Sequence, residues 1–258
     1  MRAALPAVLL LDWSFAMSIM AGNRYIFGGD KPWDEAGFTA VDDRVRGGSS
    51  VSHLIVNADR TAATFNGTLD TKTLGGAGFA SQRTVDPFLV DLTGVGALIA
   101  DVVVPADNKT YTLTLKNDIL PTGPDGREQS TVSWEYDFVA LGDGDKEGET
   151  KQVKMPIDQF KPTYRGRPAE DAKLDLANIK RISFMMRSVS VTSSFFEKQD
   201  GDFSLTIKSL AVSQSVQSES PARISEAISD DGDSKGQANQ ALSAEKEVPI
   251  WRRWLCNW

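Results

Sequence analysis

The chain of 258 residues contains one cysteine, Cys256, and one histidine, His53. A single cysteine excludes an internal disulfide, so the composition gives no sign of an oxidising compartment. One cysteine and one histidine also exclude a zinc site built from these ligand types within the chain. His53 lies in the run Val51–Val56, which predicts a strand, and a hydrogen-bonded strand histidine is favoured there over a catalytic one. We expect no catalytic residues, no cofactor and no metal.

Positive charge is also scarce, because 28 lysines and arginines face 35 acidic residues and the formal net charge is -7. Such a chain lacks the basic surface that releases counterions from nucleic acid, so we expect no nucleic-acid partner.

A hydrophobic run long enough to cross a bilayer is missing from the apolar leader, residues 1–23. Ala3–Leu11 is too short to span, and Asp12 in the middle of a longer segment would cost about 2.5–3.5 kcal/mol on insertion. Three interpretations stay open: a signal peptide with Arg2 before an apolar Leu5–Leu11, a poorly supported mitochondrial presequence, and an amphipathic leader that docks loosely.

The body of the chain, residues 24–212, has the two-residue alternation of β-strands. In Thr131–Phe138, Trp134 and Tyr136 share one face with Val132 and Phe138, and Glu135 and Asp137 take the other. About nine or ten strands separated by turn signals predict an all-β fold, an antiparallel β-sandwich or jelly roll. Short helical turns are expected at Pro156–Phe160 and Asp175–Asn178. The expected strands are Ser52–Val56, Ala62–Leu69, Gly78–Gln82, Ala97–Val104, Thr110–Lys116, Thr131–Phe138, Gln152–Met155, Arg181–Met186 and Asp202–Lys208.

The composition changes after the body. Residues 213–248 are rich in serine, glutamine, alanine and acids and lack aromatic residues, which predicts a disordered linker. The last segment, residues 249–258, indicates an interfacial membrane anchor or a short peptide that docks on a partner, with an adventitious sticky terminus as the alternative. Its candidate contact residues are Trp251, Arg252, Arg253, Trp254, Cys256 and Trp258.

Two glycine-rich segments resemble ligand loops but fail the test for them. Gly76 and Gly78 give the start of a dinucleotide-binding loop, yet position 81 is serine and the flanks predict strands. Asp143–Gly148 resembles the start of a calcium loop, but Lys154 stands where the terminal glutamate would be, so we interpret it as a solvated hairpin turn.

Arginines and acids recur beside glycines at the predicted strand ends. Arginine pairs well with carboxylates, so one interpretation is a network with Asp42, Asp43, Glu128 and Glu135 that holds loops together. The other is a polar binding face that also uses Tyr136. The candidate residues are Asp42, Asp43, Arg44, Arg46, Ser49, Arg83, Arg127, Glu128, Trp134, Arg165 and Arg167.

Two further functions compete for these residues. A carbohydrate-binding module would stack sugars on Trp134 and Tyr136 and bind hydroxyls with Glu135 and Arg127. This alternative fails if the two rings face the core. A glycoside-active enzyme would need Asp42 and Glu128 about 5–10 Å apart across a cleft, and paired acids would count against it.

Several motifs resemble the CIA30 domain, the family of complex I intermediate-associated protein 30. The most distinctive is Leu74–Arg83 after Phe65–Asp70, and Asp42–Ser50 precedes it. Ser188–Ser194 stands as an insertion relative to the family, and we interpret it as a low-complexity loop. The resemblance covers roughly Phe27 to Ala211, is greatest to short fungal members, and includes Asp125–Tyr136, Phe160–Arg167, Ile182–Arg187 and Gly201–Leu205.

The resemblance implies a galactose-binding-like β-sandwich and a non-enzymatic, chaperone-like role in assembling respiratory complex I. It implies a mitochondrial location, with the cytoplasm as the alternative. The implied partners are client subunits or other assembly factors, with peripheral membrane contact through the C-terminus. Sandwiches of this type have many functions, so the fold alone does not assign one.

Overall fold

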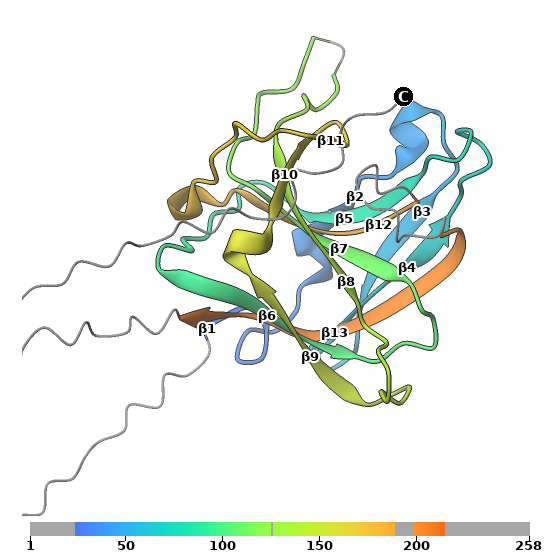
Figure 1. Ribbon diagram of the computed structural model, residues 1–258, viewed down its shortest axis with the longest axis vertical. Coiled ribbons are helices and arrows are strands. Elements are labelled where there is room, and N and C mark those ends of the chain that lie inside the picture. The colour runs from blue at the N-terminus through green and yellow to red at the C-terminus, as the bar shows by residue number, and fades with distance from the viewer. Residues whose placement is uncertain (1–23, 125, 189–198, 215–258) are drawn as a thin grey trace, which may run out of the picture. The chain divides into compact units, whose positions relative to one another are not determined.

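The computed structural model describes residues 24–124, 126–188 and 199–214, which form two antiparallel β-sheets (Figure 1). The leader, the Ser188–Ser194 insertion except its first residue, and the predicted linker and terminal segment lie outside the described residues.

Six strands form the first sheet, sheet A, and seven form the second, sheet B. In sheet A the order is β3 (Val51–Val56), β4 (Ala63–Leu69), β13 (Gly201–Gln214), β6 (Val95–Val103) and β9 (Thr150–Pro156), and β1 (Arg24–Gly28) pairs with β13. In sheet B the order is β11 (Arg167–Pro168), β10 (Lys161–Tyr164), β8 (Ser133–Val139), β7 (Thr110–Lys116), β12 (Arg181–Arg187), β5 (Phe79–Thr84) and β2 (Phe38–Ala40). The predicted antiparallel β-sandwich is therefore confirmed.

The prediction of nine or ten strands was too low, because the described residues contain thirteen. The missed strands β1, β2, β10 and β11 have five, three, four and two residues, too few for alternation to show. They are strands because neighbouring edges accept their backbone hydrogen bonds.

The helical segments of the described chain are single 3₁₀ turns. They are η1 (Glu35–Gly37), η2 (Asp43–Arg46), η3 (Ile157–Gln159) and η4 (Leu176–Asn178), and the last two confirm the predicted turns. None of them is long and apolar enough to cross a membrane, within residues 24–124, 126–188 and 199–214.

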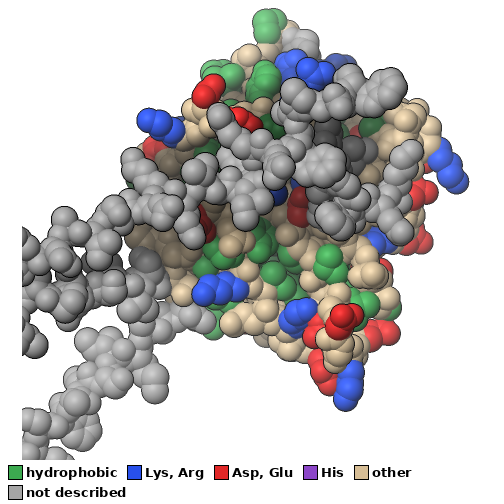
Figure 2. All heavy atoms as spheres, in the orientation of Figure 1, with side chains coloured by type: hydrophobic (Ala, Val, Ile, Leu, Met, Phe, Trp, Pro, Cys, Tyr) green, Lys and Arg blue, Asp and Glu red, His purple; other side chains and the backbone are tan. Residues whose placement is uncertain are grey.

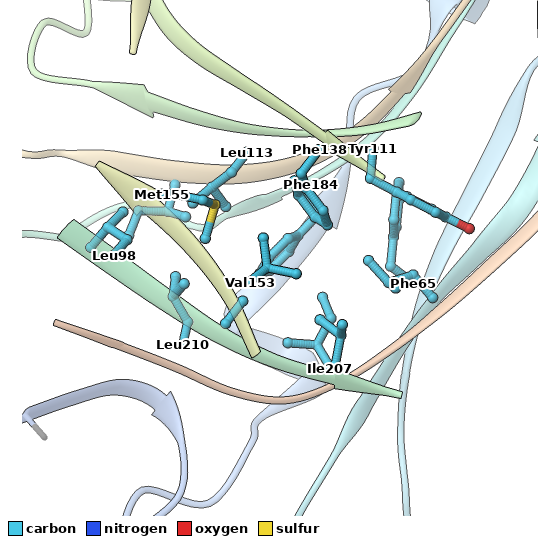
Figure 3. Close-up of a cluster of buried hydrophobic side chains, with 14 of the residues drawn as sticks. Phe65, Leu98, Tyr111, Leu113, Phe138, Val153, Met155, Phe184, Ile207 and Leu210 are labelled. Carbon is cyan, nitrogen blue, oxygen red and sulfur yellow. The ribbon is translucent and has the colours of Figure 1, made fainter. Parts of the chain in front are cut away.

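The core lies between the inner faces of the two sheets (Figure 3). Tyr111, Leu113 and Leu115 of β7 are buried toward it, opposite Phe138, Tyr136 and Trp134 of β8. Burying each such side chain fully stabilises the fold by about 1.5–3 kcal/mol. The predicted alternation of β8 is therefore confirmed. Glu135 and Asp137, between its core residues, point to the other side of sheet B.

Candidate binding face

Asp42 joins the two sheets at one edge of the sandwich. It is 2% exposed and precedes η2. Its carboxylate accepts hydrogen bonds from the backbone N–H and hydroxyl of Ser52 on β3, at 3.2 and 2.6 Å, and from the Ser81 N–H on β5, at 3.0 Å. Arg44, whose side chain is 57% exposed, adds an ion pair at 3.0 Å. One carboxylate thus holds a strand of sheet A against a strand of sheet B.

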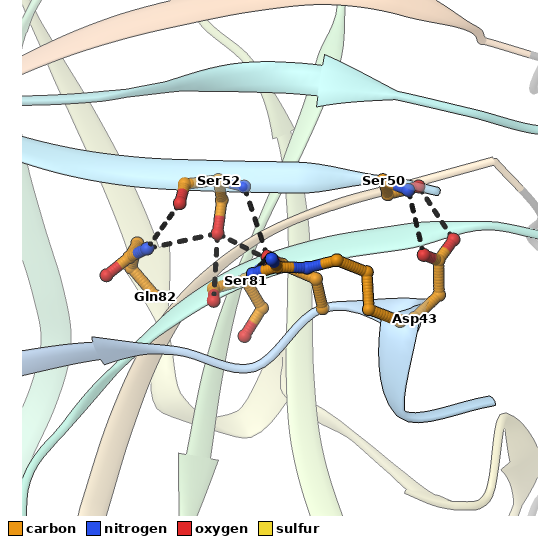
Figure 4. Close-up of polar contacts among 7 residues, drawn as sticks. Asp43, Ser50, Ser52, Ser81 and Gln82 are labelled. Atoms are coloured by element: carbon orange, nitrogen blue, oxygen red, sulfur yellow. Dashed lines mark hydrogen bonds and ion pairs between the residues drawn. The ribbon is translucent and has the colours of Figure 1, made fainter. Parts of the chain in front are cut away.

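Asp43 makes a similar connection next to it, and Figure 4 shows its two bonds to Ser50. It is fully buried and accepts bonds from the Ser50 N–H at 2.9 Å, the Ser50 hydroxyl at 2.6 Å and the Phe79 N–H at 3.2 Å. Its donors are serine and backbone groups rather than the arginines that the predicted network gave it. We call Asp42 and Asp43 the aspartate pair.

The glycines around the aspartate pair leave room for it. A Cβ on Gly48 would lie 2.3 Å from the Asp43 carboxylate, and one on Gly78 would lie 2.4 Å from the Asp70 carbonyl oxygen and 3.3 Å from the same carboxylate. Both positions therefore need glycine for close approach. Gly48 and Gly78, from two separate segments of the chain, thus both lie beside the buried Asp43 carboxylate.

The remaining candidates near this edge lie on the surface. Ser49 shares a hydrogen bond with the Thr73 hydroxyl at 3.1 Å. Arg46 lies over the Phe79 ring, 5.5 Å from its centroid. With both aspartates bonded to strand backbones, this segment connects the sheets, and Asp42 is not free for glycoside chemistry.

The outer face of sheet B carries two of the other charged candidates, Arg83 and Glu135. One row across β8, β7, β12 and β5 consists of Glu135, Thr114, Ser183 and Arg83. These side chains alternate with core residues along each strand, so they turn away from the core.

Arg187 organises one part of this outer face, which we call the Arg187 cluster. Its guanidinium pairs with Glu135 at 2.6 Å and with Asp137 at 2.7 Å. Thr163 and Thr112 donate hydrogen bonds to the same carboxylates at 2.8 and 2.6 Å. Burial alone would lower the pKa of Arg187, but the charges and hydrogen bonds of Glu135 and Asp137 outweigh it, and the pKa is raised.

Arg83 and Arg181 organise the second part, which we call the arginine–lysine cluster. Both pair with Glu128 and Asp86: Arg181 contacts Glu128 at 2.9 Å and Asp86 at 2.7 Å, and Arg83 contacts Asp86 at 3.8 Å and also Glu128. Lys116 lies opposite Arg181 on β7. Burial, together with the charge of Arg181, lowers the pKa of Lys116.

Trp134 and Tyr136 pack against the core, so these two rings do not form the sugar platform of the carbohydrate-binding alternative. Glu128, the second acid of the enzyme alternative, is held by two arginines. The described residues contain no group of three or more histidine, cysteine, aspartate or glutamate side chains placed to hold a metal.

The last candidate arginines are exposed and lie in a loop and at a hairpin. Arg127 is exposed beside Glu128, in the loop between β7 and β8. Arg165 and Arg167 are exposed at the β10–β11 hairpin, where Arg165 lies 5.3 Å from the centroid of the Tyr164 ring. The turn between β8 and β9 is also solvated, and Figure 2 shows acidic and basic side chains mixed at the bottom of the view. Lys151, near the start of β9, pairs with Asp145 of this turn.

Sequence reasoning did not single out Arg181, Lys116, Asp86 or Asp137 as site residues. The alternation in Arg181–Arg187 could have indicated Arg181. Ile182, Phe184 and Met186 are buried in the core, so the residues between and beside them, including Arg181, face the other side of the sheet. Their partners lie far away along the chain: Arg181 and Glu128 are 53 residues apart.

The fold and this site define a β-sandwich protein with a charged outer face on one sheet. The model of the family "Complex I intermediate-associated protein 30 (CIA30)" matches residues 27–207, so the chain belongs to the CIA30 family. An uncharacterized protein of Schizosaccharomyces pombe is 42% identical over 190 residues, which cover 72% of this chain and 81% of that protein.

Solved structures with a similar fold include carbohydrate-binding modules. A family 11 module of a cellulosomal cellulase of Clostridium thermocellum has a TM-score of 0.46 and 11% identity, covering 75% of this chain and 95% of that one. A family 30 module has a TM-score of 0.40 and 12% identity, covering 75% and 99%.

Proposed function

We propose that this protein is a non-enzymatic assembly factor for mitochondrial respiratory complex I, NADH:ubiquinone oxidoreductase. In a chaperone-like role, it binds a client subunit or another assembly factor through the outer face of sheet B. The observation that carries this proposal is the family match over residues 27–207, which includes almost the whole sandwich.

The distribution of charge supports the choice of surface. The outer face of sheet B holds the Arg187 cluster and the arginine–lysine cluster, which form before any partner binds. Preformed charged groups in a fixed arrangement give an interface its specificity and its rate of association. Enzymatic chemistry has less support, because Asp42 and Glu128 are already bonded.

Deletion of the gene tests the function directly. We expect the deletion strain to accumulate subcomplexes of complex I on native gels and the intact gene to restore the complex. Normal assembly in the deletion strain would refute the proposal. Fractionation of the tagged protein tests the location, since recovery in the cytoplasm alone would contradict the mitochondrial part.

A matched pair of variants tests the surface. Val139 on β8 and Ile55 on β3 are β-branched residues with 41% and 51% exposure, one on each sheet. We expect Val139→Glu to impair assembly in the complemented strain and Ile55→Glu to leave it intact. The opposite result would place the client on sheet A.

Membrane contact is a separate part of the proposal and rests on Trp251, Trp254 and Trp258, outside the described residues. A chain truncated after Val248 should be washed from mitochondrial membranes at lower salt than the full chain. Equal retention of both chains would remove the anchor role.

A further inference from the structure

Three cations occupy adjacent positions on the outer face of sheet B. Lys116 on β7 lies directly opposite Arg181 on β12, and Arg83 on β5 lies opposite Ser183, two residues from Arg181. Like charges placed opposite each other weaken a sheet. The fold therefore keeps together three side chains that repel one another.

Two carboxylates bond directly to these cations. Glu128 and Asp86 pair with both arginines, and their side chains are 46% and 47% exposed. Lys116 donates to the Thr131 hydroxyl at 3.3 Å. On the other side, Glu135 is bonded to Arg187 and Thr163. The cluster itself thus holds three positive and two negative charges, and Glu135, a third carboxylate whose charge acts on Lys116, is shared with Arg187.

Three polar atoms of the same surface have no hydrogen-bond partner. They are the Nε atoms of Arg83 and Arg181 and the Oγ1 atom of Thr114, which lies opposite Ser183 between the cations. Arg181 is 4% exposed and Thr114 is 5% exposed. Buried polar groups are almost always bonded, so unbonded donors on neighbouring strands indicate a place for an acceptor.

We propose that Lys116, Arg181, Arg83 and Thr114 form a binding site for an oxyanion, supplied by an acidic side chain of the client protein. This inference rests on the proposed function for the identity of the client. Guanidinium and ammonium groups bind carboxylates through charge-assisted hydrogen bonds, and a threonine hydroxyl adds one donor. Glu128 shows the same chemistry within the chain, since two arginines already hold its carboxylate.

Titration of the full-length protein followed by NMR of the arginine Nε–H groups tests the site. The probes are a glutamate-rich peptide, its glutamine counterpart and inorganic phosphate, at matched ionic strength. We expect the glutamate peptide to shift the Arg83 and Arg181 signals saturably and to leave that of Arg165, on the exposed hairpin, unmoved. Equal shifts with the glutamine peptide, or none with any probe, would overturn the site.

Phosphate provides the second source of the same chemistry. If phosphate binds more tightly than the glutamate peptide, the proposal that an acidic side chain supplies the oxyanion is wrong, and the site is assigned to a phosphate group. Weaker binding of phosphate would support the carboxylate.

Two variants separate a binding role from a structural one. Thr114→Val and Lys116→Met should each lower the affinity for the glutamate peptide about tenfold, as expected for one lost charge-assisted hydrogen bond. Neither should lower thermal stability. The Thr114 hydroxyl has no partner, and losing the Lys116 bond to Thr131, at 3.3 Å, is offset by removing a charge that faces Arg181. Unchanged affinity in both variants, or a loss of stability that accounts for the loss of binding, would refute the site.

The outcomes remain distinguishable from those of the gene deletion. Peptide binding with normal complex I assembly would keep the oxyanion site and refute the assembly role. Defective assembly without peptide binding would keep the assembly role and refute the site.

Discussion

The aspartate pair and the arginine–lysine cluster are both built from charged residues at strand ends, but they differ in how fully their polar atoms are bonded. Asp42 and Asp43 are buried, and each accepts bonds from β5 and from either β3 or the serine just before β3. In the arginine–lysine cluster, both arginine Nε atoms lack a partner. A buried charge whose bonds are complete holds a fold together, whereas one with unused donors has capacity left for a ligand.

The largest effect is expected from Asp42→Ala, which leaves the Ser52 and Ser81 N–H groups without their acceptor. We expect a loss of about 4 kcal/mol in the free energy of unfolding, from several buried hydrogen bonds at once. Chemical denaturation measures it. Asp30→Ala, at an exposed turn, is the control and should change stability by less than about 0.5 kcal/mol. A small loss for Asp42→Ala would erase the contrast between the two regions.

Removal of Arg187 should have the next largest effect. Arg187→Met leaves Glu135, which is 9% exposed, and Asp137 without their cation. We expect a loss of about 3 kcal/mol, in line with breaking one side of a buried ion pair. The comparison variant Arg165→Met lies on the exposed hairpin and should be nearly neutral. Equal losses in the two variants would show that the Arg187 cluster does not support the fold.

The glycine beside the aspartate pair gives a steric test. In Gly48→Ala the new methyl group would lie 2.3 Å from the Asp43 carboxylate, which is fully buried and bonded to Ser50 and Phe79. We expect a loss of about 2 kcal/mol from overpacking. In Gly37→Ala the nearest atom is 4.0 Å away, so thermal denaturation should show only a minor change. Equal losses of stability in the two variants would show that position 48 does not need glycine for the close approach of the Asp43 carboxylate.

The smallest effect, and one of opposite sign, is expected at Lys116. Lys116→Met removes a charge that faces Arg181 and should stabilise the protein by about 1 kcal/mol at neutral pH. The pKa of Lys116 is lowered from 10.5 in the folded state, so between the folded pKa and 10.5 the unfolded chain binds more protons. The wild type therefore gains stability as pH rises through this window, and the advantage of the variant narrows.

Chemical denaturation of both proteins at neutral and alkaline pH checks this prediction. A destabilised variant at neutral pH, or an advantage that widens as pH rises, would show that Lys116 contributes to the fold rather than to a ligand site.

Local pattern was enough to predict much of the sandwich. Alternation placed Trp134, Tyr136 and Phe138 on one face, because side chains on a strand take opposite faces in turn. The structure shows that this face packs against the core. That same alternation provided the test that removes the sugar platform. The short strands β10 and β11 could not be predicted this way, since pairing with neighbouring strands defines them.

The candidate site was less predictable than the fold. Arg83 and Glu128 were singled out and do pair, but Arg181 and Lys116, which complete their cluster, were not. Asp42 was expected to pair with arginine, and Arg44 does pair with it. Its other donors are the Ser52 hydroxyl and the N–H groups of Ser52 and Ser81, and Ser81 lies 39 residues away along the chain.

The sequence by itself determined the β architecture, the family motifs and the presence of charged residues beside glycines, because these depend on residue type and spacing. Only the tertiary structure decided which charges are fully bonded. Hydrogen-bond partners such as Ser81 for Asp42 or Glu128 for Arg181 come together when distant strands pair and the two sheets pack. Burial then makes each unpaired polar atom costly, and so separates the aspartate pair from the arginine–lysine cluster.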